Sequence, residues 1–174
     1  MILPIYLYGQ EVLRKADAEA DLTKKDEILQ LVSDMKETLK VADGCGLAAP
    51  QVGVPLRILI VDGTEMTETY PELKDFRRTM INPVVLEESA EKCTYQEGCL
   101  SVPGYYGDVE RPERITMEAL DRDGVKQTYQ FEGWDAKVMC HEYDHLDGIM
   151  YTDKAQTMYK AGEESEETEE AEEE

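Results

Sequence analysis

The chain contains 174 residues, of which 41% are apolar and 33% are charged. This length and composition are typical of one soluble globular domain with a single core, and no apolar run approaches the ~18 residues that a membrane helix needs. The formal net charge is −21, and nine Glu lie between residues 161 and 174. The rest of the chain is also acidic, which argues against general binding to nucleic-acid phosphates.

The expected cellular compartment is the cytoplasm. The first nine residues are too short for a signal peptide, carry no leading positive charge and lack the composition of a transit peptide. The four cysteines, Cys45, Cys93, Cys99 and Cys140, form no C-x-x-C pair. Reduced thiols are therefore expected, and a thiol beside a pair of histidines is more plausible as a metal ligand than as half of a disulfide.

The N-terminal third predicts a helix and a glycine-rich segment. Residues 2–8 alternate weakly and predict a short strand. A helix follows, with Thr23 as its N-cap and apolar residues at helical spacing. The segment 44–53 is rich in small residues, which leave room for a close approach to the backbone. Pro50 prevents a continuing helix, so Gln51 is expected on a loop or a strand edge.

The rest of the chain predicts strands, a second helix and a tail. Strands are expected at 56–61, 80–86, 92–95, 114–120 and 125–131, the last two as a hairpin. A charged surface loop is expected at 62–78, and a turn-rich segment at 97–104. A helix from about Trp134 to Leu146 should end before Gly148. Residues 156–174 end in a glutamate run and predict a disordered tail.

The second helix carries the only two histidines of the chain, in the sequence H-E-x-x-H. His141 and His145 are four residues apart, so a helix places them on one face, one turn apart. Such a pair can bind one metal ion, with Glu142 as a general base. Trp134 and Val138 share this face, which predicts that it points inward. Chance spacing and core histidines are the alternative explanations.

A catalytic metal site needs at least one more protein ligand. Many H-E-x-x-H proteases take it from a downstream residue, but here no histidine follows, and most downstream Glu lie in the predicted tail. Cys99, in the turn-rich segment, is the best upstream candidate. A thiolate and two imidazoles leave the fourth tetrahedral position open for water.

Three segments, 44–51, 97–101 and 141–145, closely resemble the peptide deformylases in their order and spacing. Their sequences are GCGLAAPQ, EGCLS and HEYDH. The resemblance runs from about residue 2 to residue 153. It implies an α+β fold of one domain, with antiparallel β-sheets packed around the central H-E-x-x-H helix. The catalytic domain would span residues 1–155, and the acidic tail residues 156–174.

The resemblance also implies a metal and a reaction. Cys99, His141 and His145 would bind one divalent metal ion, Fe²⁺ in the cell, although Zn²⁺, Ni²⁺ or Co²⁺ also suit these ligands. The reaction would be hydrolysis of the N-terminal formyl group of formyl-methionyl peptides, with release of formate. Metal-bound hydroxide would attack the formyl carbon, with Glu142 as general acid and base.

Further site residues follow from the same resemblance. Gln51 and the Leu100 N–H would stabilise the oxyanion. The peptide would bind in extended form beside the backbone of Gly44, Cys45 and Gly46. The methionine side chain would enter a pocket. The residues expected to line it are Cys45, Gly98, Trp134 and Val138, although plain core packing is the alternative for Trp134.

The expected partners are formyl-methionyl nascent peptides, and the enzyme is expected to be a monomer. A transient contact with the ribosome would fit this substrate, but nine glutamates match ribosomal RNA poorly. Specific nucleic-acid binding and membrane binding are not expected. Two other functions remain to be distinguished, namely an H-E-x-x-H endopeptidase with a downstream acidic ligand, and a metal-binding scaffold without activity. A scaffold would have no need of Gln51 or Glu142.

Overall fold

The computed structural model describes residues 1–161. Within them the chain forms two α-helices, α1 (Lys25–Ala42) and α2 (Trp134–Leu146). The strands are β1 (Gly46–Ala48), β2 (Ile58–Asp62), β3 (Arg77–Glu88), β4 (Lys92–Cys99), β5 (Val102–Pro112), β6 (Arg114–Leu120), β7 (Lys126–Glu132) and β8 (Thr157–Lys160). The short 3-10 helices are η1 (Glu11–Arg14), η2 (Ala49–Val52), η3 (Thr64–Met66), η4 (Pro71–Leu73) and η5 (Tyr151–Asp153). Most of the predicted tail, 162–174, lies outside the described residues.

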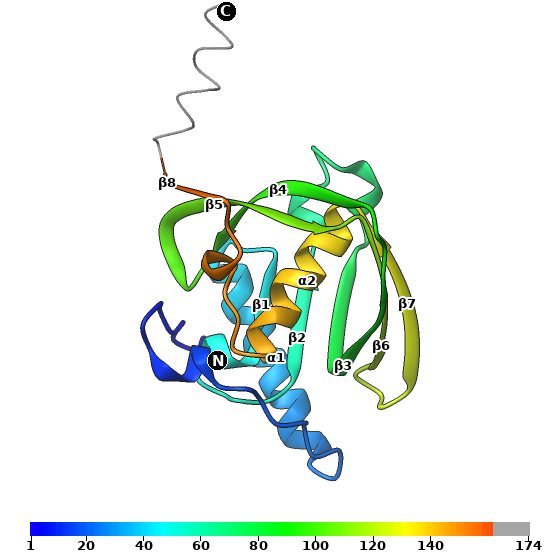
Figure 1. The fold of residues 1–174 in the computed structure, drawn as a ribbon. Coiled ribbons are helices and arrows are strands. Elements are labelled where there is room, and N and C mark those ends of the chain that lie inside the picture. Colours follow the sequence, from blue (N-terminus) through cyan, green and yellow to red (C-terminus); the bar gives the residue numbers. More distant parts are fainter. Residues whose placement is uncertain (162–174) are drawn as a thin grey trace, which may run out of the picture.

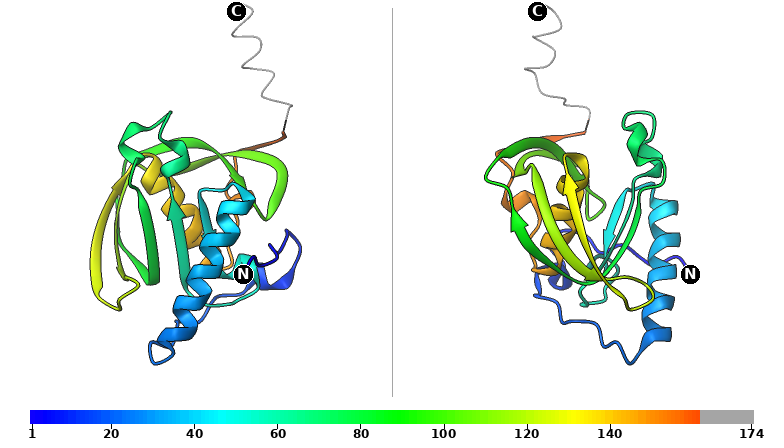
Figure 2. Two further views of the ribbon diagram at one scale, coloured as in Figure 1. Left: turned by 180° about the vertical axis from the view of Figure 1, so that it is seen from behind. Right: turned by 90° about the vertical axis from the view of Figure 1, so that its right-hand side faces the viewer.

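Two antiparallel sheets surround α2. One has five strands in the order β1-β2-β3-β6-β7, and the other has three in the order β4-β5-β8. Figure 1 shows α2 between the two sheets, and Figure 2 shows α1 along the outer side of β1 and β2. This is the expected α+β fold, with antiparallel sheets around the H-E-x-x-H helix. Among residues 1–161, no helix combines the length and the apolar character needed to cross a membrane.

Strand β2 is buried on both faces and joins the two main parts of the core. Leu59 and Val61 belong to the cluster that packs under α2, whereas Ile58 and Ile60 belong to the cluster that packs under α1. This alternation follows from the period of two in a strand. It explains why the predicted strand at 56–61 is a nearly continuous apolar run.

The N-terminal segment differs from its prediction. Residues 2–8 form no strand, because their backbone bonds go to two separate places. The Tyr6 N–H donates to the Gln51 carbonyl at 2.7 Å, and the Tyr8 N–H donates to the Ser101 carbonyl at 2.7 Å. The segment therefore ties η2 to the turn after β4. Gln51 itself lies in η2 rather than on a loop or a strand edge.

Strands β5 and β8 are absent from the prediction. In β5, Val109 and Arg111 are both buried, and a charged residue at an inward position hides the alternation that would have indicated a strand. Strand β8 pairs with β5 from Tyr105↔Lys160 to Asp108↔Thr157. The tail was expected to begin at residue 156, but residues 157–160 form β8. The folded part of the chain therefore extends beyond residue 155. The hairpin of β6 and β7 and the bounds of α2 are confirmed.

Candidate metal centre and its cavity

Helix α2 presents its inward face to both sheets. His141 and His145 are 7% and 1% exposed, and Val138 on the same face is also buried. The helix ends at Leu146, and Gly148 follows with a φ of +74°. A Cβ atom on this glycine would lie 2.6 Å from the Arg14 carbonyl oxygen. A glycine is therefore needed for the sharp exit that lets η1 pack against the end of the helix.

Cys99, His141 and His145 form a group with metal-ligand geometry. One ligand atom from each residue lies within 4.8 Å of the other two, and Cys99 Sγ is 3.4 Å from His145 Nε2. A sulfur and a nitrogen bound to one tetrahedral ion are separated by about 3.5 Å. The thiol comes from the last residue of β4, next to the turn that leads into β5. The residues present fit a single metal ion.

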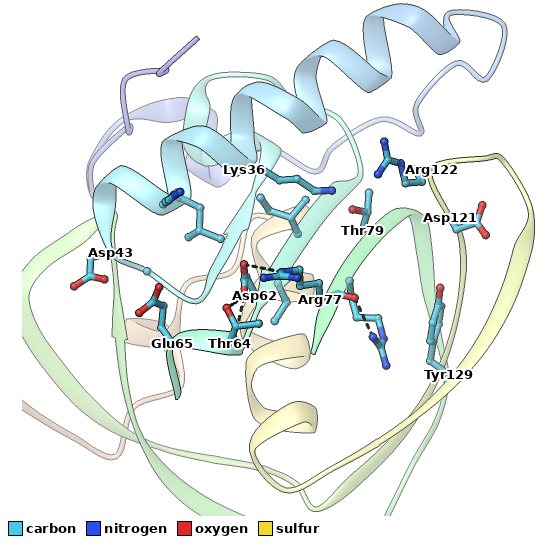
Figure 3. Close-up of a pocket in the computed structure, with 16 residues that line it drawn as sticks. Lys36, Asp43, Asp62, Thr64, Glu65, Arg77, Thr79, Asp121, Arg122 and Tyr129 are labelled. Atoms are coloured by element: carbon cyan, nitrogen blue, oxygen red, sulfur yellow. Dashed lines mark hydrogen bonds and ion pairs between the residues drawn. The ribbon is translucent and has the colours of Figure 1, made fainter. Parts of the chain in front are cut away.

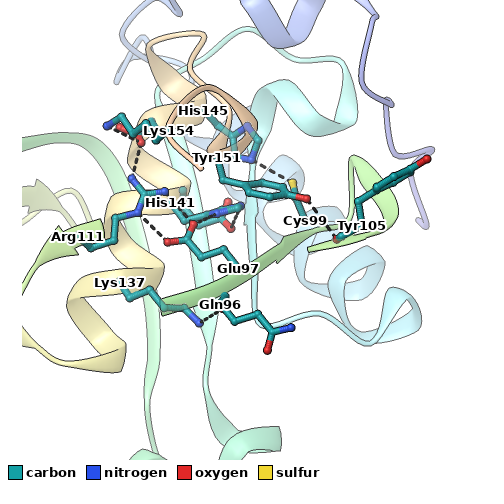
Figure 4. Close-up of polar contacts among 12 residues, drawn as sticks. Gln96, Glu97, Cys99, Tyr105, Arg111, Lys137, His141, His145, Tyr151 and Lys154 are labelled. Atoms are coloured by element: carbon teal, nitrogen blue, oxygen red, sulfur yellow. Dashed lines mark hydrogen bonds and ion pairs between the residues drawn. The ribbon is translucent and has the colours of Figure 1, made fainter. Parts of the chain in front are cut away.

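A buried ion-pair network holds His141 from the other side (Figure 4). His141 Nδ1 is 2.8 Å from a carboxylate oxygen of Glu97. Arg111 donates to both Glu97 oxygens at 2.8 Å and to Asp144 at 2.6 Å. Burial alone would raise the pKa of Glu97, but the bonds from Arg111 and His141 lower it to about 2. An ionised Glu97 fixes the ring so that Nε2 faces Cys99 and His145.

The sequence analysis missed two residues of this network, Glu97 and Arg111. Glu97 and Arg111 meet only because β4 and β5 pair, and β5 was not predicted. Tyr151 was also missed. Its ring stacks on His141 with centroids 5.9 Å apart, and its hydroxyl donates to the Tyr105 carbonyl at 3.2 Å. Of these residues, only Glu97 lies in the segment 97–104 that was predicted to be rich in turns.

Glu142 lies on the open side of the cluster. Its side chain is buried, one oxygen is 3.9 Å from His141 Nε2, and the other has no hydrogen-bond partner within the described chain. Burial raises the pKa of Glu142 to about 7. A Cβ atom on Gly46 would lie 2.7 Å from a Glu142 oxygen. The glycine of β1 therefore gives this carboxyl group its space.

Gln51 is held by both ends of its amide. Its carbonyl oxygen accepts from the Ala48 N–H at 2.9 Å. Its amide nitrogen donates to Ser101 Oγ at 3.1 Å and lies 3.4 Å from Cys99 Sγ. The side chain is 1% exposed. These contacts direct an N–H donor toward the metal-ligand group, with its orientation fixed in advance.

A cavity of about 440 Å³ opens onto this group. Of the residues predicted for the site, the lining includes Gly44, Cys45, Gly46, Gln51, Gly98, Cys99, Leu100, Val138, His141 and Glu142. Trp134 does not line it. Its indole packs in the core, 6.3 Å from the Phe76 ring and 6.2 Å from the Tyr70 ring between centroids, which corresponds to the core-packing alternative. Lys137 lines the cavity although it was not predicted.

The sequence model of the polypeptide deformylase family matches residues 2–161. A peptide deformylase of Flavobacterium johnsoniae is 41% identical over 167 residues, covering 92% of this chain and 85% of that protein. One from Rhizobium meliloti is 42% identical over 152 residues, covering 87% of this chain and 84% of that protein.

Solved structures agree. A class I type b peptide deformylase from Acinetobacter baumannii superposes with a TM-score of 0.82 at 33% identity, covering 88% of this chain and 99% of that one. The enzyme from Thermotoga maritima superposes with a TM-score of 0.80 at 34% identity, covering 90% and 99%. The Acinetobacter enzyme was also solved with Met-Ala-Ser bound, and that structure superposes with a TM-score of 0.81. This chain therefore belongs to the polypeptide deformylase family, and it is a hydrolase.

Proposed function

We propose that this enzyme removes the N-terminal formyl group from formyl-methionyl nascent peptides and releases formate. The observation that carries the proposal is the meeting of three elements in one cavity. A metal-ligand group of two histidines and a cysteine lies beside the fixed amide of Gln51 and beside Glu142, one of whose carboxylate oxygens has no hydrogen-bond partner within residues 1–161. Nascent chains are made in the cytoplasm, so we propose that the enzyme acts there. We also propose that it acts as a monomer.

Cys99, His141 and His145 would hold one divalent cation, Fe²⁺ in the cell, with Zn²⁺, Ni²⁺ or Co²⁺ as substitutes. When bound, such an ion acts as a Lewis acid and lowers the pKa of a water ligand towards ~7. Glu97 supports His141 through the bond at 2.8 Å. Because this carboxylate is itself held by Arg111, the ring keeps one tautomer and one orientation.

Glu142 would carry the proton. Its pKa of about 7 allows it to accept a proton from water and to donate it to the departing amine near neutral pH. Gln51 Nε2 and the Leu100 N–H would donate to the oxygen of the formyl carbonyl as negative charge develops there. Loss of one such donor typically reduces turnover by ~10²–10³.

The peptide would bind in extended form along the backbone of Gly44, Cys45 and Gly46, at the edge of the five-stranded sheet. Strand β1 is an edge strand whose single neighbour is β2, so its free side can accept another extended segment. The methionine side chain would enter the part of the cavity lined by Cys45, Gly98 and Val138. Trp134 lies in the same core cluster as Val138, and its ring contacts Phe76 and Tyr70.

The experiment is formate release from formyl-Met-Ala-Ser by anaerobically purified protein, with metal analysis of the same sample. We expect turnover with Fe²⁺ bound, and a loss of both metal and turnover in Cys99→Ser. Cys93→Ser is the matched control, because Cys93 lies at the far end of β4, away from the cavity. No turnover with iron, nickel or cobalt bound would overturn the proposal.

Formate release also separates a deformylase from an endopeptidase, because cleavage within a peptide releases no formate. Two acids that follow His145 in the described chain, Asp147 and Asp153, form ion pairs with Arg57 and Arg14, which leaves them unsuited as a third ligand. Cleavage within an unformylated peptide is therefore not expected.

A further inference from the structure

Lys137 lines the active-site cavity but has no part in the reaction proposed above. Within residues 1–161, it is the only Lys or Arg among the residues that line this cavity. Helix α2 carries it directly before Val138 and one turn before His141. Its side chain is half-buried. Lys137 therefore supplies the one ammonium group of the described chain that a substrate in this cavity could meet.

The contacts of this ammonium group place it beside the subsite proposed for the methionine side chain. Lys137 Nζ donates to the Gln96 carbonyl on β4 at 3.4 Å (Figure 4), and it lies 5.8 Å from the centroid of the Tyr95 ring. Gly98 follows on the same strand, and Val138 follows on the helix. Both line the methionine subsite.

The ammonium group has hydrogen-bonding capacity to spare. A Lys ammonium has three N–H donors, and the bond to Gln96 is longer than the usual range of about 2.7–3.2 Å. Lys137 forms no ion pair within residues 1–161, and Glu97 is already bonded twice to Arg111. Burial lowers the pKa of Lys137, although nearby Glu97 and Cys45 oppose this shift. An ammonium group that is poorly solvated gains from any acceptor that reaches it.

We propose that Lys137 extends the substrate range to formyl peptides whose first side chain ends in a neutral hydrogen-bond acceptor, above all methionine sulfoxide. This inference rests on the proposed function. The sulfoxide keeps the length of methionine and adds one S=O oxygen, which makes the side chain polar. A purely apolar pocket would leave that oxygen unpaired and would disfavour the substrate by up to about 10²-fold. The Lys137 ammonium would instead donate to it.

The acidic residues of the cavity select a neutral acceptor over an anion. Asp43, Glu65, Glu97 and Glu142 line the same cavity as Lys137. These residues would repel a carboxylate side chain on the substrate wherever they are ionised. A sulfoxide has no net charge, so it gains the hydrogen bond from Lys137 without this repulsion.

A neighbouring hollow supplies a matched control residue. It has a volume of about 720 Å³ and lies between α1, β2, β3 and the turn of the β6–β7 hairpin (Figure 3). Five cationic and four acidic residues line it, so neither sign of charge dominates. Lys36 reaches into this hollow from α1 but does not line the active-site cavity. Lys36→Met is therefore the control for Lys137→Met.

The test compares formate release from formyl-Met-Ala-Ser and from the same peptide with methionine sulfoxide. The ratio of the two kcat/KM values, measured on one preparation, does not depend on how much of the protein is folded and metal-loaded. In the unaltered enzyme, the sulfoxide peptide should be hydrolysed within about fivefold of the methionine peptide. Lys137→Met should lower the ratio by at least about tenfold, since it removes a charged donor. Lys137→Arg should keep most of the ratio, because a guanidinium also donates, and Lys36→Met should leave it unchanged.

The loss in Lys137→Met should appear mainly in KM. The S=O oxygen is remote from the formyl carbon, so the donor binds it equally in the ground state and the transition state. A formyl-norleucyl peptide has no acceptor at the end of its first side chain. Its kcat/KM relative to formyl-Met-Ala-Ser should therefore not fall in this variant.

Three results would overturn the proposal. The first is hydrolysis of the sulfoxide peptide by the unaltered enzyme more than about 10²-fold more slowly than the methionine peptide, which needs no variant to fold. The second is an unchanged ratio in Lys137→Met. The third is faster hydrolysis of a formyl-glutamyl peptide than of the sulfoxide peptide, which would show selection for an anion. No formate from any of these peptides would instead overturn the proposed function, so the two failures are distinguishable.

Discussion

Two buried glutamates flank His141, and their surroundings shift their pKa values in opposite directions. Glu97 is bonded to Arg111 and His141, and its pKa falls to about 2. Glu142 has one oxygen without a partner in the described chain, and burial raises its pKa to about 7. Both are carboxyl groups beside the same ring. The difference shows that the paired one is fixed as an anion for support, while the unpaired one is free to exchange a proton near neutral pH.

The largest expected effect comes from removing the proton carrier. Glu142→Gln keeps the size of the side chain but cannot accept a proton, so turnover should fall by about 10²–10⁴. Metal content should stay the same, because Glu142 is outside the ligand group. Formate release and metal analysis on one sample measure both. Turnover near that of the unaltered enzyme, with metal bound, would remove Glu142 from the mechanism.

Breaking the paired side should affect stability instead. Arg111→Met leaves Glu97 and Asp144 buried without their main partner, and we expect a loss of about 3–5 kcal/mol in the free energy of unfolding. Metal affinity should also fall by about 10–100-fold, since His141 loses its fixed orientation. Urea unfolding and metal titration measure the two effects.

The control for this change is Lys154→Met. Lys154 also contacts Asp144, at 3.0 Å, but its side chain is 43% exposed. Its loss should cost less than about 1 kcal/mol. If both substitutions cost the same, the buried network around Glu97 has no special part in holding the site.

These two carboxyl groups also show how much of the site could be predicted from the sequence. The H-E-x-x-H spacing is local to one helix, so α2, its inward face and the position of Glu142 could be predicted from the chain alone. The partner of Glu97 lies 14 residues away on β5, a strand whose inward Arg111 conceals its alternation. Long-range pairing of buried charges leaves no periodic signal. Trp134 shows the same limit, because the helical face predicts that it points inward but not whether it meets the cavity or the core.

A third prediction probes the space around the unpaired glutamate. In Gly46→Ala, the new methyl group would lie 2.7 Å from a Glu142 oxygen, so the carboxyl group must move. Displacement of a catalytic group by a fraction of an ångström to 1 Å costs up to about 10²-fold, and we expect a loss of at least about tenfold in kcat. The double variant with Glu142→Gln should be no slower than Glu142→Gln alone. Additive losses would mean that Gly46 acts through the peptide rather than through Glu142.

The smallest effect concerns Asp17, a carboxyl group like that of Glu142 but away from the cavity. Its oxygens are buried without hydrogen bonds inside the described chain, and burial raises its pKa from 3.8 to about 7. A raised pKa means that stability is present below pH 3.8 and is lost as the pH rises through about 7. Asp17→Asn should therefore increase the free energy of unfolding by about 1–2 kcal/mol at pH 8 and by little at pH 4. Urea unfolding at both pH values tests this, with formate release as the check that activity is unchanged. An equal gain at both pH values would show that the ionised form of the carboxyl group is not the source of the destabilisation.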